Sequence, residues 1–111
     1  MTFDEFSKIN LERANDWHND GIEEWSLSDW AVAMVGEAGE ACNQIKKFNR
    51  VRVNLHSNNP DGFDMAKLAE EIADTFIYLD ILVARCGLNL EEIVRAKFNA
   101  ISERENLPQR V

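Results

Sequence analysis

The chain has 111 residues and a formal net charge of −8, and 45% of its residues are hydrophobic. This length fits one domain, and the apolar content excludes a chain that is disordered by composition. Residues 1–40 hold ten acids and two bases, so they carry the whole net charge. Because nucleic-acid binding needs clustered Lys and Arg, no nucleic-acid partner is expected, whereas an acidic surface suits cations.

Four helices are predicted from capping residues and apolar spacing. The first begins after Thr2, with Glu5 as the reciprocal capping residue, and ends near residues 19–21. The second begins after Ser26, and its apolar residues recur at alternating spacings of three and four. These residues are Leu27, Ala31, Met34, Ala38, Ala41, Ile45 and Phe48.

The clearest loop is predicted at about residues 49–63, which are rich in Asn, Pro and Gly. The third helix begins near Asp64 and stops at Gly87, and Asn89 caps the fourth. A tail of about residues 105–111, containing Pro108, is expected to be disordered or docked. No strand pattern is present, so we predict an all-α bundle of four to five helices in one domain, residues 1–111.

The sequence shows no Cys-x-x-Cys motif and no cluster of Cys with His, so a structural zinc site is not expected. It has no apolar run of 18 residues and no recognisable leader segment. We therefore expect a cytoplasmic protein without a membrane partner.

Two pairs of acids stand out, Glu37 with Glu40 in the second helix and Glu71 with Asp74 in the third. The i,i+3 spacing makes both carboxylates of a pair project from one helix face, beside the apolar stripe. If the two stripes pack together, four carboxylates line the edge of the seam and repel one another. A divalent cation would relieve the repulsion, and oxygen ligands favour Mg²⁺ or Mn²⁺. The alternative interpretation is a solvated acidic surface without a metal.

Small residues flank the first pair of acids. Gly39 in mid-helix costs about 1 kcal/mol relative to Ala. This cost is easier to explain if a ligand approaches the backbone closely.

The two acidic motifs and their flanking residues resemble the MazG-like all-α nucleotide pyrophosphohydrolases. The resemblance covers residues 27–104. It is carried by residues 35–40, which contain Glu37-x-x-Glu40, by residues 68–79, which contain Glu71-x-x-Asp74, and by residues 87–99, which end in Lys97-Phe98-Asn99. Many relatives have a further acid at the position of Gly36 and a tighter group of Lys, Asn and Arg than this chain has.

This resemblance implies a helical bundle that forms a homodimer or a dimer of dimers. It also implies Mg²⁺-dependent hydrolysis of a (deoxy)nucleoside triphosphate to the monophosphate and pyrophosphate, an activity that suits house-cleaning of the nucleotide pool. The implied metal ligands and catalytic residues are Glu37, Glu40, Glu71 and Asp74. Either Glu40 or Glu71 would accept the proton of the attacking water.

Substrate contacts are expected from aromatic and basic residues. Base recognition needs an apolar slot with a stacking face, for which Trp30 and Tyr78 are the chosen residues. The residues predicted to contact phosphate are Lys46, Lys47, Lys97, Asn99 and Arg104. Two other functions stay open: a related phosphohydrolase acting on a phosphoribosyl nucleotide, and a non-enzymatic acidic helical module that binds a protein partner.

Overall fold

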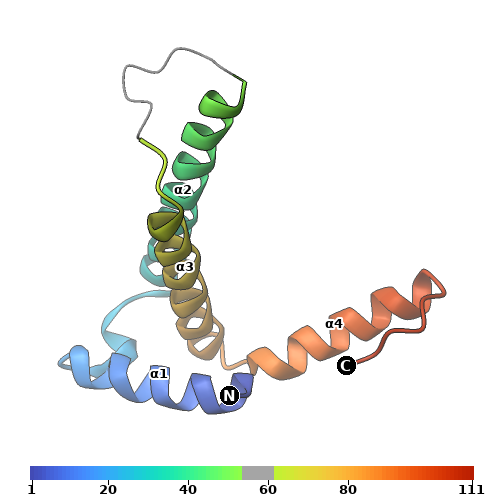
Figure 1. Cartoon of the computed structure of the whole chain (residues 1–111). Helices are drawn as coiled ribbons and strands as arrows, with labels where there is room; N and C mark the ends of the chain where they lie inside the picture. The colour runs from blue at the N-terminus through green and yellow to red at the C-terminus, as the bar shows by residue number, and fades with distance from the viewer. Residues whose placement is uncertain (54–61) are drawn as a thin grey trace. The chain divides into compact units, whose positions relative to one another are not determined.

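The computed structural model describes residues 1–53 and 62–111, and every regular element in these ranges is helical (Figure 1). The elements are α1 (Phe3–Trp17), the short 3₁₀ helix η1 (Gly21–Glu24), α2 (Leu27–Arg52), α3 (Met65–Arg85) and α4 (Leu90–Arg104). The prediction of an all-α chain is confirmed. In the described ranges, no helix combines the length and the apolar character that crossing a membrane requires.

The described chain forms two compact units. One unit comprises Met1–Trp25 with Asp80–Val111, and the other comprises Ser26–Leu79. The expectation of one domain over residues 1–111 stays a prediction.

The first two α-helices begin at the predicted capping boxes. The Thr2 hydroxyl accepts a hydrogen bond from the Glu5 N–H at 3.1 Å, while the Thr2 N–H donates to the Glu5 carboxylate at 2.7 Å. Ser26 and Asp29 exchange the same two bonds at 3.1 and 2.9 Å. The N–H and the hydroxyl of Ser26 both donate to the Asp29 carboxylate, each at 2.9 Å, and lower the pKa of Asp29. Each box satisfies N–H groups that have no partner within the helix.

The boundaries of α3 and α4 also follow from local signals. The Asp64 carboxylate accepts hydrogen bonds from the N–H groups of Ala66 and Lys67 at 2.9 and 3.3 Å, which caps α3. After α3, Gly87 has a φ of +72°, a left-handed conformation that favours glycine and ends the helix. Asn89 caps α4 by accepting from the Glu92 N–H at 2.9 Å.

The predicted loop begins later than expected. Residues 49–52 belong to α2, so the prediction of a loop from residue 49 is wrong there, and residues 54–61 of that loop lie outside the described residues. Arg50 and Arg52 occupy the last turn of α2, where positive charge complements the helix dipole. The turn-forming residues that follow led the sequence pattern to place the start of the loop too early.

The unit made of residues 1–25 and 80–111 contains a buried polar contact. The Asn10 amide donates to the Asp80 carboxylate at 2.9 Å, and Arg13 donates to the Asn10 carbonyl oxygen at 3.2 Å. Asn10 is 3% exposed and Asp80 is 1% exposed. Within the described residues the second Asp80 oxygen, Oδ1, has no hydrogen-bond partner. The single Asn10–Asp80 bond therefore satisfies one half of a fully buried carboxylate.

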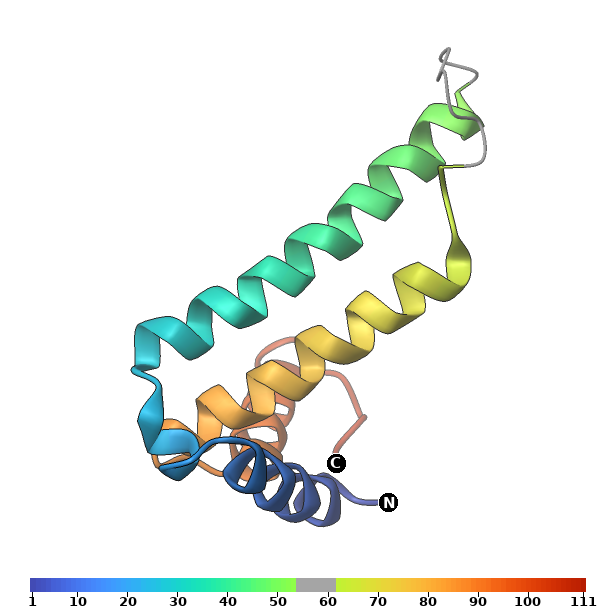
Figure 2. The same ribbon diagram turned by 90° about the vertical axis from the view of Figure 1, so that its left-hand side faces the viewer.

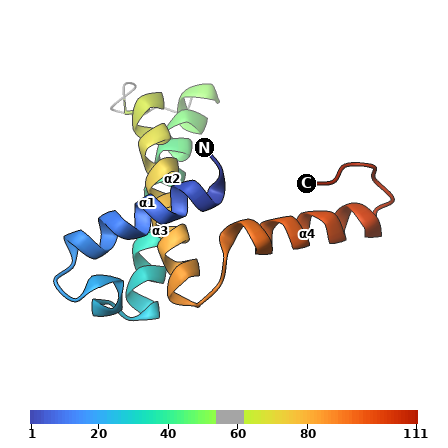
Figure 3. The same cartoon turned by 90° about the horizontal axis from the view of Figure 1, so that it is seen from below.

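Other contacts in this unit join its helices. After α1 the chain turns back through η1, as seen from below in Figure 3, and α1 packs against both η1 and α4. Arg85 pairs with Glu23 at 3.0 Å and donates to the Trp25 carbonyl at 3.1 and 3.3 Å. These long-range bonds stabilise the position of η1, which local sequence signals did not predict.

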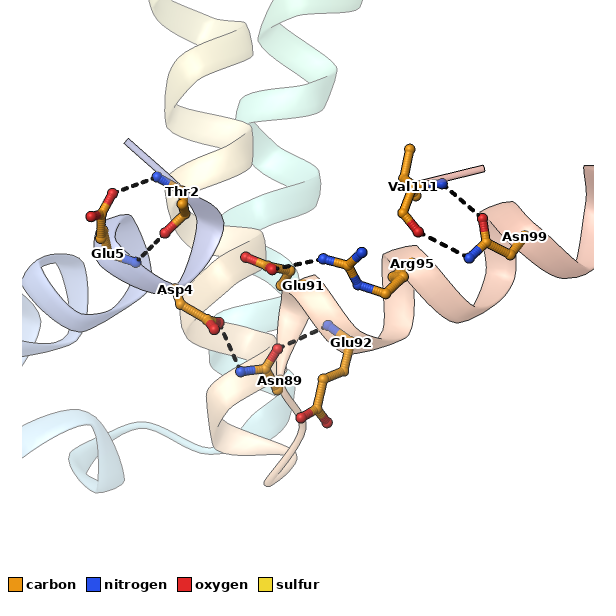
Figure 4. A network of polar contacts seen from close by, with 9 residues as sticks. All are labelled: Thr2, Asp4, Glu5, Asn89, Glu91, Glu92, Arg95, Asn99 and Val111. Atoms are coloured by element: carbon orange, nitrogen blue, oxygen red, sulfur yellow. Dashed lines mark hydrogen bonds and ion pairs between the residues drawn. The ribbon is translucent and has the colours of Figure 1, made fainter. Parts of the chain in front are cut away.

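The N-cap residue of α4 is bonded to α1, and the tail returns to α4 (Figure 4). The Asn89 amide donates to the Asp4 carboxylate at 2.9 Å. Farther along α4, the Asn99 side chain donates to the Val111 carbonyl and accepts from the Val111 N–H, both at 3.0 Å. Of the two expectations for the tail, disordered or docked, this pair of bonds supports docking.

The unit of residues 26–79 consists of α2 and the adjoining part of α3, which run side by side in opposite directions (Figures 1 and 2). Near one end the rings of Trp30 and Tyr78 have centroids 6.1 Å apart. Toward the other end the Gln44 carbonyl oxygen accepts from the Asp64 N–H at 3.1 Å. Trp30 and Gln44 are fourteen residues apart, and so are Asp64 and Tyr78. This spacing equals two heptads on each side of an antiparallel helix pair.

The face that α2 buries is rotated from the predicted apolar stripe. Leu27 and Ile45 of that stripe are 46% and 44% exposed, whereas Trp30 and Gln44 are buried. Ala41 is the stripe residue that is also buried. The stripe prediction was therefore wrong in part, because aromatic and polar side chains occupy the heptad positions that face α3.

Candidate metal centre

Three of the four predicted acids come together in the unit of residues 26–79. Glu37 on α2 and Glu71 and Asp74 on α3 each offer a carboxylate oxygen, and these oxygens lie within 4.8 Å of one another. Glu37 and Glu71 each lie one heptad from the Trp30–Tyr78 contact, so the antiparallel pairing sets them opposite each other. Asp74 joins them because it lies one turn beyond Glu71 on the same helix face. These three residues are called the acid cluster below.

The acid cluster runs from the interior to the surface. Glu71 is 6% exposed, Glu37 is half-buried and Asp74 is exposed. Carboxylates are rarely buried without a compensating partner, because leaving water disfavours the charged form. The cluster thus combines a buried charge with a side that solvent and solutes can reach.

The electrostatics at Glu71 reflect this crowding. A side-chain hydrogen bond with Glu37 raises the pKa of Glu71 above its ordinary value, and desolvation and the like charge of Glu37 raise it further. A hydrogen bond with Glu40 and the positive charge of Lys67 lower it, but the net pKa shift is upward. Glu71 therefore binds a proton more readily in the metal-free cluster than an isolated carboxylate does, as expected where carboxylates share a site.

Glu40 lies beside the acid cluster without being one of its three converging residues. Its hydrogen bond with Glu71 places it next to that carboxylate, and its own side chain is exposed. The structure thus brings all four predicted acids into one neighbourhood, with three of them close enough together to share an ion.

The donor set fits a hard divalent cation. The three converging groups are all carboxylates, which Mg²⁺ and Mn²⁺ prefer, and no His or Cys belongs to this group in the described ranges. Mg²⁺ usually keeps several waters and combines one or two carboxylates with substrate phosphates. A cation would also offset the charge conflict that otherwise favours a proton on Glu71. The acid cluster could hold a metal on these grounds.

The predicted aromatic residues pack against each other one heptad from the acid cluster. Trp30 is 1% exposed, and its ring is inclined at 42° to that of Tyr78. Tyr78 is half-buried and follows Asp74 by one turn of α3. Tyr78 is consequently the more accessible of the two rings, and Trp30 supports it from the interior.

The two predicted lysines of α2 differ in direction. Lys47 lies seven residues beyond Glu40, a rotation of about 20° about the helix axis, so the two share a face. Lys46 points about 120° away from Glu40. Lys47 is half-buried and Lys46 is exposed. Lys47 is therefore the one that shares a face of α2 with Glu40.

The remaining predicted substrate residues lie on α4, in the other unit. Asn99 bonds to Val111, and Arg104 pairs with Glu105 at 2.7 Å. Lys97 is exposed and borders an open apolar groove of about 460 Å³. The other lining residues of this groove are Ile93, Val94, Phe98 and Ile101. Their contact with a substrate stays a prediction.

Sequence reasoning did not single out Lys67, whose charge acts on Glu71, or Gln44, which is buried on α2 one heptad beyond Glu37. The signal for Lys67 was available, because it precedes Glu71 by four residues. Gln44 carried no such signal, because a buried Gln in a helix seam looks like a surface residue in an apolar pattern.

Comparisons of the chain with protein-family models, with curated proteins and with solved structures give no match. The resemblance to the MazG-like enzymes therefore rests on the quoted motifs.

Proposed function

We propose that this protein is a Mg²⁺-dependent nucleoside triphosphate pyrophosphohydrolase of the MazG-like kind. The observation that carries the proposal is the acid cluster, in which Glu37, Glu71 and Asp74 from two helices present oxygens within 4.8 Å of one another. Acids that gather around a buried carboxylate disfavour one another's charged forms unless a positive charge offsets them. A cation-binding role explains both the gathering and the burial of Glu71.

In this proposal three of the acids bind the metal and the fourth accepts a proton. Glu37, Glu71 and Asp74 hold the cation, Mg²⁺ or alternatively Mn²⁺, and Glu71 is ionised when the cation is present. When bound, the cation neutralises phosphate charge and makes a coordinated water more acidic. Glu40 is exposed beside Glu71 and is not one of the three converging acids. We therefore propose that Glu40 accepts the proton of the attacking water.

Placement of the substrate then decides which phosphorus is attacked. Tyr78 would hold the base one turn of α3 from Asp74, with Trp30 packed behind its ring. A base fixed at this end of the hairpin brings the α-phosphate, rather than the γ-phosphate, to the acid cluster. Attack there yields the monophosphate and releases pyrophosphate in one step.

We also propose that copies of the chain associate as a homodimer or a dimer of dimers. Val32, Val35 and Ile72, all in the unit of residues 26–79, are 70%, 60% and 56% exposed. A chain this short buries a limited share of its apolar surface alone. Sedimentation that gives a monomer mass at all concentrations would contradict the association.

The test is pyrophosphate release from a panel of nucleoside triphosphates, with and without Mg²⁺. Glu37→Gln and Asp74→Asn should lower turnover on the order of 100-fold or more, because charge stabilisation worth about 3 kcal/mol is lost. Glu70→Gln is the matched control, since Glu70 is an exposed neighbour on α3 outside the acid cluster. Full activity in either cluster variant would eliminate the proposed site.

A further inference from the structure

Lys67 occupies an unusual place at the start of α3. It lies in the first turn of the helix, and Asp64, which caps that turn, accepts a hydrogen bond from its backbone N–H. Its side chain is exposed and forms no ion pair within 4.0 Å among residues 1–53 and 62–111. The ammonium group is thus available to a ligand.

Helix stability does not explain this position. A positive charge in a first turn faces the positive end of the helix dipole, which disfavours it. A Lys four residues before a Glu also has the less favourable order for an i,i+4 pair. A lysine that its helix disfavours, and that pairs with no acid in the described part of the chain, suggests a role outside helix stability.

The helix geometry directs Lys67 toward the acid cluster. Lys67 precedes Glu71 by four residues and Asp74 by seven, which are rotations of about 40° and 20° about the helix axis. All three side chains therefore share one face of α3. Lys67 also lies close enough to Glu71 for its positive charge to act on that carboxylate.

We propose that Lys67 binds the phosphate chain of the substrate at the acid cluster and holds the pyrophosphate end as it departs. This proposal rests on the function proposed above. A polyphosphate bound at the cluster brings several negative charges near Glu71 and Asp74, and Lys67 offsets them on the same helix face. Lysine suits this task, because it acts as a point charge toward phosphate oxygens in any direction.

The proposal predicts opposite effects on cation and anion. Removing the charge in Lys67→Met takes a positive group away from the metal ligands, so Mg²⁺ should bind at least as tightly as in the wild type. Pyrophosphate, titrated calorimetrically at saturating Mg²⁺, should bind about tenfold or more weakly, as for loss of one hydrogen bond to a charged group. Lys67→Arg should keep most of the affinity. Lys8→Met, an exposed lysine on α1, is the matched control.

The outcomes separate this role from the proposed function. Wild-type pyrophosphate affinity in Lys67→Met would overturn the role of Lys67, even if triphosphates are cleaved. Equal losses of Mg²⁺ and pyrophosphate binding in Lys67→Met would also overturn it, since they indicate a structural effect. Lys67→Arg repeats both measurements in a variant that retains the positive charge. If no triphosphate is cleaved but pyrophosphate binding still depends on Lys67, the anion site stands and the enzymatic proposal fails.

Discussion

Replacing Glu71 with Gln isolates the charge conflict in the acid cluster. The pKa of Glu71 is raised in the folded protein above its ordinary 4.5, mainly by the hydrogen bond with Glu37. A carboxyl group with a raised folded pKa stabilises the fold when protonated, and this contribution is lost as the pH rises through the folded pKa. As the pH rises above the ordinary pKa of 4.5, the metal-free fold is therefore weakened relative to the unfolded chain, in which the group ionises more easily. Glu71→Gln should melt at a higher temperature than the wild type at about pH 8, and the gain should vanish below about pH 4.

Magnesium should reverse this order. A ligand at 100 times its dissociation constant stabilises the folded state by about 2.7 kcal/mol. For 111 residues, the unfolding entropy is about 0.23 kcal/mol/K, so the wild-type melting temperature should rise by about 12 °C. Glu71→Gln loses a ligand oxygen from the buried centre of the cluster and should show little of that rise.

The assay is thermal unfolding followed by circular dichroism, with EDTA and then with Mg²⁺. Glu70→Gln serves as the control, because it removes the same charge from the neighbouring exposed position. Two results would refute the reasoning. One is an equal Mg²⁺ stabilisation of the wild type and Glu71→Gln. The other is a metal-free Glu71→Gln protein that is no more stable at pH 8 than Glu70→Gln.

Four further substitutions test other parts of the account. Gly39→Ala and Gly36→Ala should each stabilise α2 by about 1 kcal/mol, because no described side chain or distant backbone lies within 4 Å of an added Cβ. A lower midpoint of chemical denaturation would contradict this. A loss of activity confined to Gly39→Ala would indicate that the substrate approaches the backbone closely at Gly39. Asn10→Ala should lower the free energy of unfolding by about 2–3 kcal/mol, because it removes the hydrogen bond to the buried Asp80 carboxylate, and an unchanged urea midpoint would be the contrary result. Tyr78→Ala should raise KM for a triphosphate while leaving the calorimetric Mg²⁺ affinity near that of the wild type, and the reverse pattern would assign Tyr78 to the metal.

Local signals sufficed for most helix boundaries. The capping boxes at Thr2 and Ser26 and the left-handed Gly87 depend on residues a few positions apart, so the sequence predicts them directly. The gathering of acids was also predictable in outline. The i,i+3 spacing fixes each pair on one face, and antiparallel neighbours bring the two faces together.

The seam between α2 and α3 was not predictable from apolar spacing. Glu71 and Gln44 are buried there, although both residue types are usually exposed. A prediction from apolar residues alone therefore shifts the face that is expected to be buried. The acids were expected at the edge of the seam, whereas Glu37 and Glu71 lie in its heptad register. The short helix η1 escaped prediction for a different reason, since Arg85 secures it from sixty residues away.

The most direct test of the central claim is the fate of the attacking water. Hydrolysis of a nucleoside triphosphate in ¹⁸O-labelled water with Mg²⁺, followed by phosphorus NMR, shows which product carries the labelled oxygen. Attack at the α-phosphorus by water held at the acid cluster predicts the label in the nucleoside monophosphate and none in the pyrophosphate. Label in pyrophosphate, or nucleoside diphosphate and orthophosphate as the first products, would contradict the account.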